Sequence, residues 1–109
     1  MSAKPSVLRA RARRDIDEAV ERYLNEAGPA ITLAFVDALE DALRGIGERP
    51  AVGSSRYALD LDIPGLRFRP AGKFPHLIFY VETGLEIDVW RVLHGARDIP
   101  EWMREPGEG

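Results

Sequence analysis

The stretch from Leu77 to Asp98 constrains the fold of this chain more than any other segment. Two apolar runs rich in β-branched and aromatic residues, 77–82 and 85–94, flank a break at Thr83 and Gly84. Such runs favour strands, and a glycine can supply the positive φ that a tight hairpin turn needs. We therefore expect a β-hairpin that closes a sheet.

Two amphipathic helices are expected before the hairpin. Apolar residues recur at steps of three and four over 16–27 and again over 31–46, which places them on one face of each helix. Asp15 is a candidate N-cap for the first helix. Gly28 and Pro29 suit the end of the first helix and the first turn of the second, so the two helices form a hairpin. The second helix is expected to stop at Gly45, Gly47 and Pro50.

A loop over 51–64 separates the helices from three expected strands at about 65–70, 74–82 and 85–94. The short connections between these strands require antiparallel pairing. Val7 and Leu8 supply one more edge strand. The sequence thus predicts an α+β fold of order β-α-α-β-β-β, with an antiparallel sheet packed on a helical hairpin. We expect one domain over 1–104 and a disordered tail over 105–109.

Composition excludes several classes of protein. The 109 residues include no cysteine, which rules out a disulfide framework, and no run approaches the roughly 20 apolar residues of a membrane helix. We expect a cytoplasmic protein that does not bind membranes. The net charge of −3 argues against direct, specific binding of nucleic acid.

Candidate chemistry is sparse. With only two histidines, His76 and His94, and no cysteine, a zinc site of the usual kind is not expected. No serine lies in a nucleophile elbow and no glycine-rich loop is built to hold phosphate. His76 is expected to be a half-exposed strand residue and His94 a turn residue at the end of the last strand. The sequence therefore predicts no catalytic residue, no metal and no cofactor.

Both faces of the expected sheet are apolar. Alternation along the last strand places Leu85, Ile87, Val89 and Leu93 on one face, and Trp90 and Val92 on the other. One helical hairpin can cover only one face. The second face is then covered either by a partner chain, which we favour, or by the loop over 51–64 or the segment 99–103 folding back.

Several segments resemble a known family in their order and spacing. They are Arg14-Asp15-Ile16-Asp17-Glu18, Ala34-Phe35-Val36-Asp37-Ala38-Leu39, Glu48-Arg49-Pro50, Pro64-Gly65-Leu66-Arg67, Pro75-His76-Leu77-Ile78-Phe79-Tyr80 and Arg91-Val92-Leu93-His94-Gly95-Ala96-Arg97-Asp98. In these segments the chain resembles the ParE-like toxins of the RelE/ParE superfamily. The resemblance implies a toxin of a type II toxin-antitoxin module that inhibits DNA gyrase, is not an enzyme, and is neutralised by a ParD-like antitoxin, a ribbon-helix-helix DNA-binding protein.

The resemblance also implies two sets of contact residues. The antitoxin is expected to bind a groove formed by the helical hairpin and the sheet, with the candidates Phe35, Leu39, Tyr80, Trp90 and Val92. The target is expected to bind the basic strand ends and the C-terminal region, with the candidates Arg67, Arg69, Arg91, His94, Arg97 and Trp102.

Two alternative functions stay open at this point. A RelE-like toxin would cleave messenger RNA on the ribosome, and such cleavage needs a general base, a general acid and cations around the scissile phosphate. The candidates for these groups are Arg67, Arg69, Lys73, Arg91 and His94. The second alternative is a degenerate, non-toxic protein that still binds the antitoxin.

Overall fold

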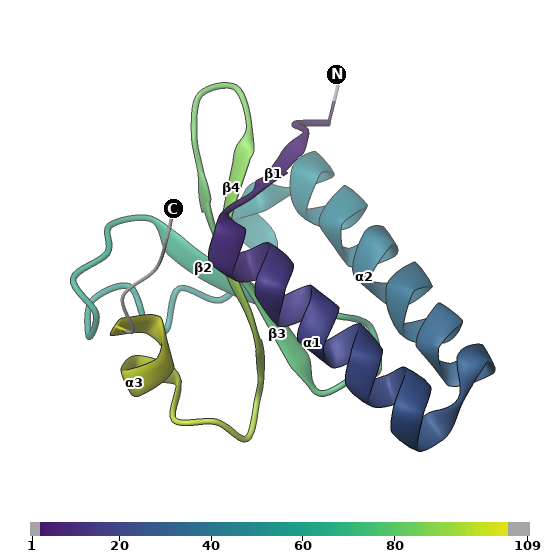
Figure 1. Cartoon of the computed structure of the whole chain (residues 1–109). Coiled ribbons are helices and arrows are strands. Elements are labelled where there is room, and N and C mark those ends of the chain that lie inside the picture. Colours follow the sequence, from purple (N-terminus) through teal and green to yellow (C-terminus); the bar gives the residue numbers. More distant parts are fainter. Residues whose placement is uncertain (1–2, 105–109) are drawn as a thin grey trace.

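A computed structural model describes residues 3–104, which fold into two helices, a sheet and a short last helix (Figure 1). The elements in chain order are β1 (Ser6–Leu8), α1 (Ala10–Ala27), α2 (Pro29–Glu48), the 3-10 turn η1 (Pro50–Val52), β2 (Leu66–Pro70), β3 (His76–Glu82), β4 (Ile87–His94) and α3 (Ile99–Arg104). The predicted order β-α-α-β-β-β is confirmed, and α3 follows it. The tail expected over 105–109 lies outside the described residues.

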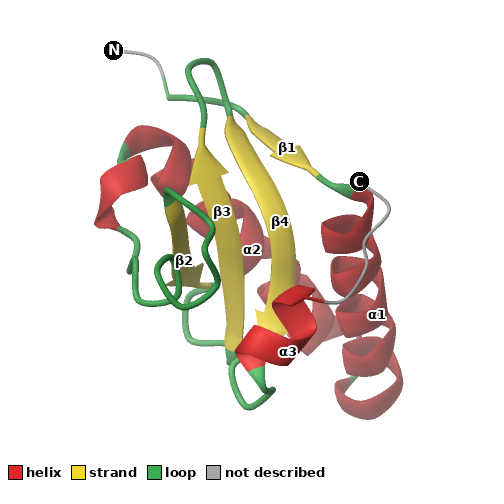
Figure 2. Ribbon diagram, turned by 90° about the vertical axis from the view of Figure 1, so that its left-hand side faces the viewer, coloured by secondary structure: helices red, strands yellow, loops and turns green. Residues whose placement is uncertain are grey.

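The four strands form one sheet in the order β1-β4-β3-β2. The pairs β2–β3 and β3–β4 are antiparallel, as predicted, whereas β1 runs parallel to β4 and makes the sheet mixed. Parallel pairing requires a long connection between the two strands, and everything from α1 to β3 supplies it. In Figure 2, α2 lies behind the sheet and α3 lies in front of it.

The first helix begins earlier than the sequence predicted. The chain passes from β1 directly into α1, and Arg9 occupies the N-cap position without a side-chain cap. Asp15 is therefore an interior residue of α1, and its assignment as a cap was wrong. Gly28 ends α1 with the predicted positive φ, +89°, and Pro29 begins α2.

The second helix continues through both glycines to Glu48. Gly47 does not stop the helix but allows a close approach, because a Cβ at this position would collide with the carbonyl oxygen of Lys4. The Lys4 N–H donates a hydrogen bond of 3.0 Å to the Gly47 carbonyl, which holds the N-terminal segment against α2.

The β3–β4 hairpin differs from the prediction in its turn and in its register. The turn is a wider loop over 83–86, closed by the Thr83 N–H donating to the Glu86 carbonyl at 2.9 Å, and Gly84 does not adopt a positive φ. Phe79 pairs with Arg91 but Tyr80 pairs with Val89, so Trp90 is an extra residue at a β-bulge.

The bulge changes which side chains of β4 point to each face of the sheet. Ile87, Val89 and Val92 all pack in the core under the helices, whereas Leu93 joins the cluster on the opposite face. The predicted grouping of Leu93 with Val89 was wrong, because an extra residue inverts the alternation of side chains beyond it.

The second face of the sheet is covered by this chain itself. Leu66, Phe79, Leu93 and Ile99 form its buried cluster. The residues that pack on this cluster come from the loop after η1, from β2 and β3, and from α3: Tyr57, Ala58, Leu61, Ile63, Phe68, Leu77, Val81, Trp102 and Met103. The favoured expectation of an apolar face left for a partner was therefore wrong, and the loop and the C-terminal segment fold back over it.

A buried ion pair joins α1, β4 and α3. The Arg91 guanidinium donates to both carboxylate oxygens of Asp15 at 2.7 and 2.8 Å, and to the main-chain carbonyl of Trp102 at 2.7 Å. The Asp15 carboxylate also accepts the Val92 N–H at 3.0 Å, on an edge of β4 that β1 does not reach. The side chains of Arg91 and Asp15 are 5% and 8% exposed.

We expect Asp15→Asn to lower the free energy of unfolding by about 3–5 kcal/mol, because it removes the buried carboxylate that binds the Arg91 guanidinium and the Val92 N–H. Urea denaturation followed by circular dichroism measures the change. Asp41→Asn is the matched control, because it removes an exposed ion pair with Arg44 and should leave the midpoint unchanged. Equal midpoints for Asp15→Asn and Asp41→Asn would contradict a structural role for the buried pair.

Candidate functional site

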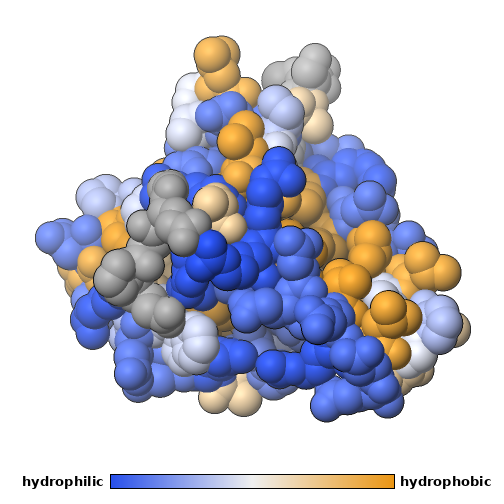
Figure 3. Space-filling view, viewed as in Figure 1, coloured by the Kyte–Doolittle hydropathy of each residue, from blue (hydrophilic) through white to orange (hydrophobic). Residues whose placement is uncertain are grey.

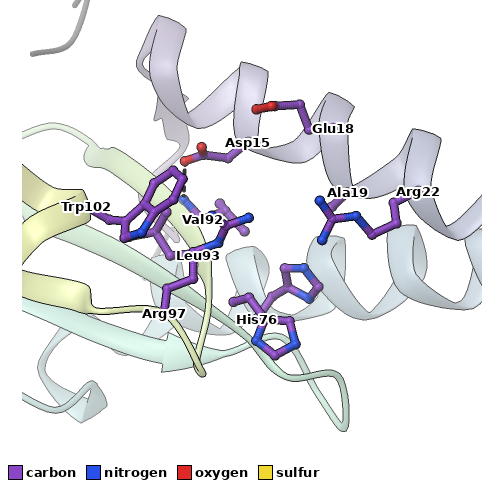
Figure 4. A pocket seen from close by; sticks show the side chains of 10 residues that line it. Asp15, Glu18, Ala19, Arg22, His76, Val92, Leu93, Arg97 and Trp102 are labelled. Atoms are coloured by element: carbon purple, nitrogen blue, oxygen red, sulfur yellow. Dashed lines mark hydrogen bonds between the residues drawn. The ribbon is translucent and has the colours of Figure 1, made fainter. Parts of the chain in front are cut away.

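A small pocket lies where the end of β4 meets α1 and α3 (Figure 4). Its volume is about 70 Å³. The lining residues are Asp15, Glu18, Ala19, Arg22, His76, Val92, Leu93, His94, Arg97 and Trp102. Asp15 lines the pocket and accepts the Val92 N–H, a hydrogen bond drawn as the dashed line in Figure 4.

Two arginines from different elements flank this pocket. Arg22 reaches it from α1, and Arg97 lies in the segment between β4 and α3. The Arg97 guanidinium stacks on the Trp102 ring, with 3.9 Å from Cζ to the ring centroid, and so is held in place by a cation–π contact. Within residues 3–104, no ion pair joins the guanidinium of Arg22 or Arg97 to a carboxylate.

The two histidines form a cross-strand pair beside the arginines. His76 of β3 is opposite His94 of β4, and their ring centroids are 5.4 Å apart. His76 packs against Phe35 at 4.9 Å between ring centroids and is only 8% exposed, so the expectation that it is half-exposed was wrong. The His94 Nδ1 accepts the Ala96 N–H at 3.0 Å, which matches the predicted turn residue.

His76 is uncharged at neutral pH. Burial lowers its pKa from 6.5 to about 4, and the positive charges of His94, Arg22 and Arg97 add to the effect. Its Nδ1 is buried and has no hydrogen-bond partner among the described residues. The pocket is therefore lined by two arginines and two acidic residues, and one of its histidines has a buried nitrogen without a hydrogen-bond partner among the described residues.

The structure brings together only part of the predicted target-binding set. His94, Arg97 and Trp102 line the pocket, and Arg91 lies in its pair with Asp15. Arg67 and Arg69 lie on β2, at the other edge of the sheet.

Local contacts hold these two β2 arginines, one against the residue after η1 and the other beside α2. Arg67 donates to the Gly53 carbonyl at 2.8 Å. Arg69 lies beside Gly45 of α2, with Asp41 and Ala42 around the same depression. The predicted basic group is thus two separate groups.

Most of the predicted antitoxin-binding residues belong to the core. Four of them are between 0% and 4% exposed and so do not line an exposed groove: Phe35, Leu39, Tyr80 and Val92. Apolar side chains on the helices and on the sheet pack against each other instead of lining an opening between the two layers. Trp90 is partly exposed, lies under the Arg9 guanidinium at 3.9 Å, and donates to Asp88 at 3.1 Å.

The sequence analysis missed two lining residues on α1, Glu18 and Arg22. Their spacing was an available signal, because Asp15, Glu18 and Arg22 lie at steps of three and four and so share one face of a helix. It also missed exposed apolar residues near the α1–α2 turn, where Leu24 is 50%, Ile31 44% and Leu33 64% exposed. Figure 3 shows apolar surface at this end of the molecule.

No group of three or more potential metal ligands lies together within the part of the chain that the structure describes. No helix of residues 3–104 has the length and apolar character needed to cross a membrane. The fold is an α+β domain. A helical hairpin covers one face of a small sheet, and the C-terminal helix and the loop after η1 cover the other face.

Comparison with known proteins identifies the class to which this domain belongs. The family described as the ParE toxin of the type II toxin-antitoxin system parDE matches residues 7–99. This range begins within β1 and includes every element from α1 to β4, and the chain belongs to the ParE toxin family. The family predicted from the sequence is thereby confirmed.

The structure is similar to a solved chain described as the chromosomal ParDE toxin-antitoxin system from P. aeruginosa. The TM-score is 0.67 at 21% sequence identity, and the alignment covers 85% of this chain and 98% of that chain. At this identity the likeness establishes the fold. No curated protein matches the chain in sequence.

We expect the free energy of unfolding to decrease as the pH is lowered and His76 becomes protonated. The unfolded chain binds the proton near pH 6.5 and the folded chain only near pH 4, so the free energy of unfolding should be constant above about pH 7 and fall between these values. The loss is at most about 3 kcal/mol, since one pKa unit corresponds to about 1.4 kcal/mol. Urea denaturation at a series of pH values measures it.

His76→Phe should remove this component of the pH dependence, because phenylalanine fills the same aromatic surroundings without titrating. His94→Gln is the matched control and should retain most of the decline. Superimposable pH profiles for the wild-type chain and His76→Phe would contradict the assignment.

Proposed function

We propose that this chain is a toxin that inhibits DNA gyrase by binding it and is neutralised by a ParD-like ribbon-helix-helix antitoxin. The observation that carries the proposal is the match to the ParE toxin family over residues 7–99, which spans nearly the whole fold. The solved neighbour is described as a ParDE system, which supports an antitoxin as the partner.

The arrangement of cations supports a binding protein rather than a nuclease. Cleavage of RNA at the 2′-hydroxyl needs a base, an acid and cations that converge on one phosphate. Of the candidates, Arg91 is bound in the buried pair with Asp15, and Arg67 is bound to Gly53 at the opposite edge of the sheet. His94 lies beside Arg22 and Arg97, whereas Arg67 and Arg69 lie on β2 at the other edge of the sheet, so the candidate groups do not converge on one phosphate.

The target surface that we propose is the end of the molecule around the pocket. Trp102 and Arg97 are stacked there in a fixed geometry, and His94 lies beside them. Aromatic and arginine side chains are the residue types that most often dominate the energy of protein interfaces.

The antitoxin surface that we propose differs from the predicted groove. Leu24, Ile31 and Leu33 are exposed near the turn between α1 and α2, where an antitoxin segment can bury them without opening the core. Charged side chains border this apolar surface on α1, among them Glu21, Arg22 and Glu26. An apolar centre with a charged rim is typical of a protein interface.

We expect the purified chain, in stoichiometric excess, to block supercoiling by gyrase and to stabilise cleaved DNA. Arg97→Ala should weaken this inhibition about tenfold, because truncation of an arginine at an interface centre commonly costs more than ~1 kcal/mol. Agarose-gel supercoiling assays over a range of toxin concentrations measure the effect.

Arg56→Ala is the matched control, since Arg56 is an exposed arginine that stacks on Tyr57 in the loop after η1. It should inhibit as well as the wild-type chain. Unimpaired supercoiling together with cleaved messenger RNA in a translating extract would instead support the nuclease alternative.

We expect Leu33→Asp to reduce affinity for the antitoxin about tenfold or more, because it places a charge in the apolar centre of the proposed surface. Its thermal midpoint should stay near that of the wild-type chain, since Leu33 is 64% exposed. Isothermal titration calorimetry with the antitoxin encoded beside the gene measures the affinity.

Leu59→Asp provides the comparison, because Leu59 is 89% exposed in a loop away from the α1–α2 turn. It should bind the antitoxin normally. If both variants bound with wild-type affinity, the antitoxin surface would have to lie elsewhere.

A further inference from the structure

The pocket at the end of β4 has the features of a binding site for one small anion. Two guanidiniums, Arg22 and Arg97, flank it from different elements, and neither forms an ion pair within residues 3–104. In Figure 4 the Arg22 side chain extends from α1 toward the imidazole rings, whereas Glu18 points away from them. The positive charges in the pocket are therefore available to a ligand.

The floor of the pocket supplies an independent observation. His76 is 8% exposed, and its Nδ1 has no hydrogen-bond partner among the described residues. His76 lines the pocket, and buried polar atoms are nearly always satisfied by protein, water or ligand, so its Nδ1 lacks a partner that the described residues do not supply.

The main chain adds a donor on the same side. The Val92 N–H points away from β3 to Asp15, and the Gly95 N–H points toward β3 and donates to the Pro75 carbonyl at 2.7 Å. Alternation along the strand then directs the His94 N–H to the Asp15 side, which is the side of the pocket. A backbone N–H and two guanidiniums together match the acceptor oxygens of a carboxylate.

We propose that this pocket binds the carboxylate of one acidic side chain of the target protein, held between Arg22 and Arg97. The pocket, of about 70 Å³, has room for a carboxylate. Glu18, Glu21 and Glu26 line the adjoining depression and would repel the successive phosphates of a nucleic acid. They would attract a partner in which a basic side chain follows the acidic one.

The identity of the target rests on the proposed function, but binding of the carboxylate does not. The full chain alone, labelled with ¹⁵N and ¹³C, is titrated with sodium acetate and, in parallel, with sodium chloride at equal ionic strength. Acetate should shift the ring signals of His76 and His94 and the Nε–H signal of Arg22 in a saturable manner.

Arg22→Gln should reduce the acetate affinity severalfold, whereas Arg13→Gln, an exposed arginine on the same helix, should leave it unchanged. Linear shifts with no saturation, shifts of equal size in chloride, or an equal response in both variants would overturn the proposal. Dimethyl phosphate carries the same single charge and represents a nucleic-acid backbone. Preference for it over acetate would assign the pocket to a phosphate and equally overturn the proposal.

The supercoiling assay, run with the wild-type chain and with Arg22→Gln, distinguishes loss of the carboxylate site from failure of gyrase inhibition. If gyrase is not inhibited but acetate binds as described, the site exists and the target is another protein. If gyrase is inhibited equally by the wild-type chain and Arg22→Gln, the pocket is not the contact with that target.

Discussion

The buried pair of Asp15 and Arg91 is the interaction on which the rest of the structure depends. β1 is short, so the edge of β4 that faces away from β3 has no strand partner beyond Val89. Asp15 substitutes for that partner by accepting the Val92 N–H, and Arg91 neutralises it while also binding the carbonyl of Trp102. One charge pair thus fixes the helical hairpin, the strand edge and the C-terminal helix relative to one another.

Local patterns in the sequence were sufficient for most of the architecture. Steps of three and four residues predicted both helices, and β-branched runs with short connections predicted the three antiparallel strands. The bulge at Trp90 could not be predicted, because the extra residue depends on which partner each strand residue selects across the sheet. The predicted face was therefore wrong for the β4 residues after the bulge, and Leu93 was grouped with Val89.

The site was harder to predict than the fold, for a related reason. The sequence does not show which arginines are buried. Arg91 forms a buried ion pair, Arg67 donates to a loop carbonyl, and the Arg97 guanidinium stacks on the Trp102 ring. Apolar residues present the same difficulty, since Phe35 and Tyr80 fill the core while Leu24 and Leu33 do not. Burial depends on the packing of layers that are distant in the chain, and no single stretch of sequence encodes it.

The position of α3 affects how any shortened form of this protein should be understood. Ile99 is part of the cluster that covers the second face of the sheet, Trp102 carries the carbonyl that binds Arg91, and the Trp102 ring supports Arg97. Deleting the C-terminal segment would uncover apolar side chains and loosen a buried charge in the same step. Loss of toxicity after truncation could therefore result from a destabilised domain or from a lost contact with the target. Single substitutions of surface residues distinguish the two causes.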